Sequence, residues 1–278
     1  LAHHYSQAEA VLGSEKLVRY SLLAGERALA TYAREDALAH FERALAAKLG
    51  RTDTIHLEPV EGRAEDAETA AIWYGLGRAQ LEALPRERLP EAVENLIRAF
   101  NFYEHSGDRQ KAIAVAQTFI LGDFSLPRLK ELLLRGLELA APDSRDAAML
   151  LARYGRYVGQ DEGDFGAARK ALDQAFQIVW REQDPRLEMQ VRTNANTFYI
   201  FHRHWEEALR GALRVVELAK ALDEPQQEVI GHAHAFFALI ATGDSKGADR
   251  QAQAHAALGE TLRYRELGQR TCSRTWSP

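Results

Sequence analysis

Apolar residues recur along the chain at intervals of three and four, and no stretch alternates apolar and polar residues over the length of a strand. This period predicts amphipathic α-helices throughout. Turn-forming residues fall at the breaks between periodic segments, as in Ser106-Gly107-Asp108 and Asp184-Pro185. We therefore predict helices over residues 1–11, 15–33, 35–49, 66–83, 90–105, 108–120, 127–140, 143–157, 164–182, 186–203, 205–221, 225–241, 245–258 and 260–270.

Helices of this length joined by short turns are expected to form antiparallel hairpins. A triplet of spaced residues, usually small, bulky and small, recurs in the second helix of successive hairpins. Small residues allow close approach within a hairpin, and bulky ones fill the groove of the next pair. The triplets are Ala37, Phe41 and Ala44; Ala92, Leu96 and Ala99; Leu129, Leu133 and Gly136; Ala168, Leu172 and Ala175; and, more weakly, Ala208, Ala212 and Val215; and Ala248, Ala252 and His255.

The repeated triplets predict an all-α fold, a right-handed α-solenoid of about six to seven antiparallel helix pairs in which each pair is stabilised by its neighbours. We expect a single array over residues 1–278. Its first repeats occupy 1–49 and its further repeats 65–270. A polar stretch at 50–64 widens the first repeat interval and is interpreted as an inserted loop, and 271–278 as a frayed tail.

The amino-acid composition supports this fold and excludes some classes of function. Ala, Leu, Glu and Arg dominate, and these residues lose little side-chain freedom in a helix. A net charge of −5 argues against direct nucleic-acid binding, which usually relies on a basic face. No apolar run approaches the roughly 18–20 residues that cross a bilayer, and the single cysteine suits a reducing compartment. We expect a cytoplasmic protein without membrane contact.

The residue patterns of common catalytic and metal sites are missing from the sequence. It contains no Gly-x-x-x-x-Gly-Lys-Ser/Thr phosphate loop and no serine-nucleophile motif. His202 and His204, like His232 and His234, stand two apart on predicted helices, and that spacing places each pair on opposite faces. The acidic stretch at 161–164 is interpreted as a solvated turn. We predict no metal, no cofactor and no enzymatic activity.

Three residues carry a family resemblance. Trp73, Leu76 and Gly77 stand where a tetratricopeptide repeat has Trp, Leu and Gly. The chain resembles this family over nearly its whole length, and Trp73 is therefore expected to be buried between hairpins. The repeats are a few residues longer than the usual length of about 34, as in the helical arrays of MalT-like and LuxR-type ATP-dependent regulators.

The N-terminal segments extend this resemblance. Residues 1–5, 16–20 and 23–28 resemble the segment that follows the nucleotide-binding module in those bacterial regulators, and similar segments occur in multidomain adenylate cyclases. The resemblance implies a sensor or regulatory array between an upstream ATPase and a downstream effector. Because the chain starts at Leu1 without methionine, we expect it to be a segment of a larger protein. The alternatives are a free-standing scaffold or adaptor, and the helical region of such a cyclase.

The resemblance also implies a binding groove. In tetratricopeptide arrays the first helix of each pair lines a concave surface, which would hold a peptide, a protein domain or a small effector. Arginine and tyrosine amid asparagine would suit a peptide, although each position could also be an ordinary solvated residue. The aromatic residues Phe198, Tyr199, Phe201, Trp205, Phe236 and Phe237 are interpreted mostly as core. The groove candidates are Tyr74, Arg78, Arg153, Arg156, Tyr157, Asn194, Thr197 and Phe201.

Overall fold

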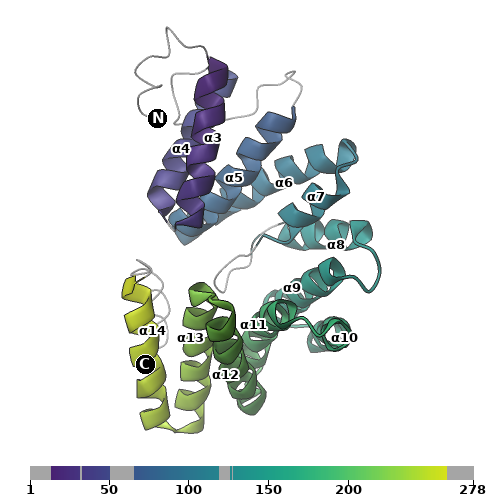
Figure 1. Ribbon diagram of the computed structural model, residues 1–278. Helices are drawn as coiled ribbons and strands as arrows, with labels where there is room; N and C mark the ends of the chain where they lie inside the picture. The colour runs from purple at the N-terminus through teal and green to yellow at the C-terminus, as the bar shows by residue number, and fades with distance from the viewer. Residues whose placement is uncertain (1–13, 32, 51–65, 119–125, 127, 262–278) are drawn as a thin grey trace. The chain divides into compact units, whose positions relative to one another are not determined.

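The computed structural model describes residues 14–31, 33–50, 66–118, 126 and 128–261 (Figure 1). Within these ranges the chain forms twelve α-helices and one short 3-10 helix, and no strand is present. Each helix packs mainly against its neighbours in the sequence. This arrangement confirms an all-α architecture of sequentially packed helix pairs and is consistent with a helical repeat array.

The chain divides into two compact units, Leu1–Leu139 and Ala140–Pro278, which we describe separately. The first holds α3 (Ser14–Ala30), α4 (Arg34–Leu49), α5 (Ala67–Ala83), η1 (Arg86–Arg88), α6 (Leu89–His105), α7 (Arg109–Ala116) and α8 (Leu129–Leu139). The second holds α9 (Arg145–Asp161), α10 (Phe165–Glu182), α11 (Pro185–Phe201), α12 (Trp205–Leu222), α13 (Pro225–Thr242) and α14 (Ser245–Thr261). The predicted helix at 1–11, the tail and, apart from Gly50, the predicted loop lie outside the described residues.

Side-chain caps explain several helix starts. Asp66 and Ser144 accept hydrogen bonds from the backbone N–H groups of Thr69 and Ala147, three residues further on. Asp164 caps α10 in the same way, and Asp184 precedes a proline at the first position of α11. These groups satisfy N–H donors that a helix leaves without partners at its start.

Several predicted helix ends were wrong, among them the end predicted at residue 33, since α3 stops at Ala30. The helix predicted to end at residue 157 continues to Asp161, and the one predicted to reach 120 stops at Ala116. The break expected after residue 258 does not occur, because α14 continues to Thr261 with Gly259 buried within it. A glycine in a helix is tolerated when the surrounding packing favours it.

The repeated triplets form the core, as expected. Their members are buried in every copy but the last, where Ala252 and His255 are only partly buried. Phe41 illustrates the packing. Its ring is fully buried between Gly25 of its own hairpin and Gly75 of the next, and both glycines approach it so closely that a Cβ atom would overlap the ring. The bulky residue of the triplet therefore does reach the neighbouring pair.

Trp73 is buried in the first unit, as predicted. It lies on α5 with 5% of its surface exposed, and the Arg98 guanidinium of α6 stands 4.7 Å from the centre of its ring. The indole Nε1 is buried with no hydrogen-bond partner among the described residues. Burial of the ring and its contact with the Arg98 guanidinium, and not a hydrogen bond of the indole, therefore hold Trp73 in place.

None of the helices in the described ranges has the length and apolar character needed to span a bilayer.

Candidate functional site

The two candidates in the first unit are engaged in contacts between its helices. Arg78 lies one turn after Tyr74 on α5, with its guanidinium 4.4 Å from the centre of the Tyr74 ring, and it forms an ion pair with Glu26 of α3. The Tyr74 hydroxyl donates to the carbonyl oxygen of Ala114 on α7, 3.3 Å away. These side chains link α3, α5 and α7 and are only partly exposed.

In the second unit, the first helices of three successive pairs pack side by side. Helix α11 contacts α9 and α13 (Figure 1). The Thr193 hydroxyl donates to Gln227 Oε1 at 2.8 Å, which links α11 to α13. His202 Nε2 hydrogen-bonds to the Gly159 carbonyl at 2.9 Å, which links the C-terminal ends of α11 and α9. The six remaining candidates, Arg153, Arg156, Tyr157, Asn194, Thr197 and Phe201, all lie on α9 and α11.

These six candidates differ in exposure. Arg156, Tyr157 and Thr197 are partly exposed, as groove residues would be. Arg153 and Asn194 are buried, with 8% and 2% of their surfaces exposed. The expectation that they are open to solvent was wrong, because close packing of the first helices covers both side chains. Phe201 is 53% exposed, although the aromatic residues around it were expected to be core.

Two buried polar groups on neighbouring first helices have unused hydrogen-bonding capacity. Asn194 Nδ2 donates to the Gln190 carbonyl at 2.9 Å, while its Oδ1 is buried with no hydrogen-bond partner in the described residues. His234 Nδ1 on α13 is likewise buried and has no hydrogen-bond partner in the described residues. Burial, together with the nearby positive charge of Arg156, lowers the pKa of His234 to about 4. The imidazole is therefore neutral at neutral pH.

Sequence reasoning missed His234 as a site residue, although a signal for it was present. His234 follows Asn194 by 40 residues, the interval that also separates Ala168, Ala208 and Ala248. The two polar groups thus occupy the same position in successive repeats. We name Arg156, Asn194, Thr197 and His234 the inner polar row. Its amide oxygen, hydroxyl, neutral imidazole and guanidinium could bind a ligand that carries both N–H groups and a carboxylate.

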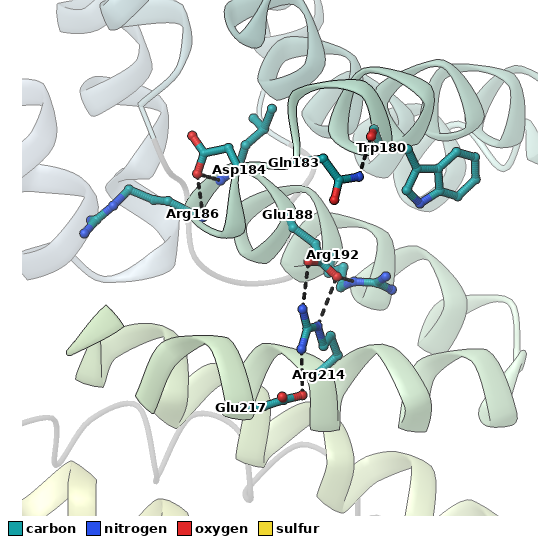
Figure 2. A network of polar contacts seen from close by, with 9 residues as sticks. Trp180, Gln183, Asp184, Arg186, Glu188, Arg192, Arg214 and Glu217 are labelled. Atoms are coloured by element: carbon teal, nitrogen blue, oxygen red, sulfur yellow. Dashed lines mark hydrogen bonds and ion pairs between the residues drawn. The ribbon is translucent and has the colours of Figure 1, made fainter. Parts of the chain in front are cut away.

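A second polar cluster joins α11 to α12 (Figure 2). Glu188 Oε1 accepts from Arg192 Nε at 2.7 Å, and the Glu188 carboxylate accepts two hydrogen bonds from Arg214, each 3.1 Å long. Arg214 also pairs with Glu217 at 2.8 Å. Burial favours a raised pKa for Glu188, but the hydrogen bonds from Arg214 and Arg192 outweigh it and lower the pKa. These hydrogen bonds and ion pairs stabilise the contact between α11 and α12 within one repeat. The cluster contains no nucleophilic side chain.

The histidines near residue 203 are arranged differently from the prediction. Helix α11 ends at Phe201, Arg203 has a positive φ of 60°, and His204 caps α12. His202 and His204 therefore lie in a turn and not on opposite faces of one helix. Both rings contact Phe165, at centroid distances of 5.2 and 5.5 Å.

These residues belong to a larger group, which we name the turn-edge aromatic cluster: Phe165, Phe198, Tyr199, Phe201, His202 and His204. Phe198 is fully buried, as predicted. In the described part of the chain, no three His, Cys, Asp or Glu side chains are grouped as metal ligands would be.

Comparison with known proteins adds no family assignment: no protein-family model matches the chain, and no curated protein is significantly similar to it.

Proposed function

We propose that this chain is a binding segment of the tetratricopeptide type, a right-handed solenoid that holds a peptide or a protein segment on the first helices of its second unit. The observation that carries the proposal is that two buried polar atoms at matching positions of neighbouring repeats, Asn194 Oδ1 and His234 Nδ1, have no hydrogen-bond partner among the described residues. The arginine at position 156 lies close enough to His234 to lower its pKa.

Unpaired buried polar groups favour a ligand at this place. Leaving such a group without a hydrogen bond costs about 1–3 kcal/mol, so proteins rarely keep one that serves no purpose. Neighbouring helices lie about 8–10 Å apart, and an extended peptide advances about 3.3 Å per residue. A peptide of three or four residues would therefore reach from α11 to α13 with its carboxylate on the partly exposed Arg156, and its N–H groups would reach Asn194 Oδ1 and His234 Nδ1 once the side chains that cover these two atoms move aside.

The wider role we propose is a sensor or regulatory array of a cytoplasmic regulator of the LuxR or MalT type, without catalytic activity of its own. Repeats longer than the usual tetratricopeptide repeat and the N-terminal segments support this role. A free-standing scaffold or adaptor, or the helical region of a multidomain adenylate cyclase, would use the same face. A phosphate loop encoded upstream of Leu1 in the full gene would favour a regulator over a scaffold.

The test is peptide binding to the inner polar row. An array of short peptides with free C-termini and acidic residues is probed with the chain, and hits are measured by fluorescence anisotropy. Arg156→Ala should weaken binding about tenfold, because a hydrogen bond to a charged group contributes about 1.5–3 kcal/mol. Arg156 is the better choice for this test because Arg153 is buried and its loss would also affect folding.

Arg210→Ala, at an exposed position of α12, removes the same charge outside the row and serves as the control. Equal loss of affinity in both variants would contradict the proposed face. A failure of every acidic peptide to bind at concentrations up to about 1 mM would contradict peptide binding by this row.

A further inference from the structure

The turn-edge aromatic cluster is placed where the second unit exposes apolar surface. Phe165 begins α10 and Phe201 ends α11, and they are 38% and 53% exposed. Both rings pack edge-on against His202, at centroid distances of 5.2 and 5.4 Å. His202 in turn is held by its hydrogen bond to the Gly159 carbonyl. Two exposed phenylalanines therefore both pack against the same histidine.

Carboxylates surround this aromatic surface. Residues 159–166 and 201–208, the two turns that meet there, contain Asp161, Glu162, Asp164, Glu206 and Glu207 and a single cation, Arg203. Glu207 lies 3.9 Å from His204, whose ring stacks on Phe165, and Asp164 directly precedes Phe165. The two turns, which we name the rim, thus contain more carboxylates than cations, and Arg169 is a cation whose charge acts on Tyr199 of the cluster.

Helix capping accounts for only part of this acidity. Carboxylates in the first turn of a helix are favourable, which explains Asp164, Glu206 and Glu207. Asp161 and Glu162 stand at the C-terminal end of α9, where a carboxylate is unfavourable by about 0.3–1 kcal/mol and a cation would be preferred. The last turns of α9 and α11 contain no basic residue. The dipole of α9 therefore does not account for Asp161 and Glu162, although both residues make other polar interactions in the structure.

We propose that this edge of the second unit is a docking surface for a basic peptide segment of a partner protein. Phe165 and Phe201 would contact the aliphatic stems of lysine or arginine and any neighbouring apolar side chain. The aromatic faces attract the cationic groups, and Glu162, Glu206 and Glu207 pair with them. The charge of the rim selects a basic partner over an acidic one. The site differs from the inner polar row in location and in the charge of its ligand.

The probe is a fluorescein-labelled peptide of alternating lysine and leucine, with a glutamate–leucine peptide of the same length as its counterpart. Binding to the whole chain is measured by anisotropy at low and at physiological salt. We expect the lysine peptide to bind and its affinity to fall with salt, and the glutamate peptide not to bind.

Two variants and two matched controls locate the site. Phe201→Ala should weaken binding about tenfold, since exposed aromatic anchors carry much of the affinity of such surfaces. The control is Trp180→Ala, which removes an aromatic side chain that is 62% exposed on α10.

The double change Glu162→Gln and Glu206→Gln should weaken binding about three- to tenfold and reduce its salt dependence. Its control, Gln174→Lys with Gln177→Lys, changes the net charge equally on exposed positions of α10. Both controls should change affinity less than about twofold.

Three outcomes overturn the proposal: no binding of the lysine peptide up to about 1 mM, equal binding of both peptides, or equal effects of Phe201→Ala and Trp180→Ala. Helicity measured by circular dichroism should be unchanged in Phe201→Ala, because this side chain is largely exposed. Because the inner polar row is tested with acidic peptides and Arg156→Ala, either proposal can fail while the other stands.

Discussion

The tight contact of Phe41 with glycine predicts a specific sensitivity at residue 75. Gly75→Ala would place a Cβ atom inside the Phe41 ring, which is fully buried and cannot move into solvent. We expect the free energy of unfolding to fall by about 1–3 kcal/mol, the usual cost of overpacking a core. Urea denaturation of the purified variant measures this loss.

Gly166→Ala is the matched control for this change. Gly166 also lies in a helix, but the nearest atom to an added Cβ is Asp164 Oδ1 at 3.6 Å, an ordinary contact. Alanine in a helix is favoured over glycine by about 0.5–1 kcal/mol, so this variant should be neutral or slightly more stable. Equal destabilisation by both substitutions would show that the Phe41 contact does not decide the effect, since helix propensity favours alanine at both positions.

Trp73 allows the contributions of volume and hydrogen bonding to be separated. Trp73→Ala should lower the free energy of unfolding by about 3–5 kcal/mol through the cavity it leaves. Trp73→Phe keeps most of the ring and removes an Nε1 group that has no hydrogen-bond partner in the described structure, so it should cost clearly less. Chemical denaturation of both variants tests this order, and a loss in Trp73→Phe as large as in Trp73→Ala would contradict it.

At the level of single residues, the sequence predicted packing better than it predicted chemistry. The small and bulky triplet positions are visible as a repeat, because their spacing follows from helix geometry. The burial of Arg153 and Asn194 could not be predicted, since it depends on how closely α9, α11 and α13 approach one another. The exposure of Phe201 fits its place among the groove candidates and contradicts its place in the aromatic core: α11 ends at this residue, so no following turn of helix covers it.

Among the helices, the connection between α11 and α12 depends on one carboxylate. The Glu188 side chain is 18% exposed and accepts hydrogen bonds from Arg192 and Arg214. Glu188→Gln removes the negative charge between two guanidinium groups, and we expect a loss of about 1–3 kcal/mol. Glu217→Gln is the control, because Glu217 is 67% exposed and contacts only the outer side of Arg214. That change should cost less than about 0.5 kcal/mol.

The effect of Glu188→Gln should also depend on pH. The pKa of Glu188 is lower in the folded state than its ordinary value, so the charged form contributes stability above that ordinary value of about 4.3. This contribution is lost as the pH falls through the folded-state pKa. Denaturation curves at several pH values should show the difference between wild type and variant shrinking in acid. A difference that stays constant would mean that the carboxylate charge plays no part.

Helix positions were predicted well where turn-forming residues mark the boundaries and less well elsewhere. The cap at Asp184 and the proline after it made the start of α11 visible. Its end lacks such a signal: the chain turns at Arg203, which adopts a positive φ without being glycine. The residues at this position have only a weak local preference for a turn. The His202 and Phe165 rings pack against each other at the turn. The prediction for His202 and His204 failed for this reason.

For the whole molecule, His234 on α13, whose ring nitrogen Nδ1 is buried, predicts sensitivity to mild acid. Burial lowers the pKa of His234 to about 4 from its usual 6.5. Between these values the unfolded chain binds more protons, so stability falls as the pH drops from about 6.5 to 4, by up to about 3 kcal/mol. His234→Gln should flatten the dependence of unfolding free energy on pH in this range, while His105→Gln, at an exposed position in the first unit, should not. An unchanged slope in His234→Gln would contradict the assignment.

The predicted single array and the two observed compact units describe different levels of organisation. The spacing of triplets identifies neighbouring repeats, because each repeat packs on the next. It contains no information about where contacts along the chain become sparse, as they do between Leu139 and Ala140. The continuous solenoid therefore remains a prediction, while sequential packing of helix pairs is confirmed.

The division into two units predicts that destabilisation stays local. In a repeat protein the free energy of opening depends on each repeat and its neighbours, so a cavity at Trp73 should mainly weaken the helices around α5. Hydrogen exchange measured by mass spectrometry should show faster exchange in α3 to α7 of Trp73→Ala. The free energy of opening of α9 to α14 should change by less than about 0.5 kcal/mol. Glu188→Gln should give the reverse pattern, with faster exchange in α11 and α12. If either variant accelerates exchange equally in both units, the chain unfolds as a single cooperative body. The free energy of unfolding of one unit then depends on the other unit.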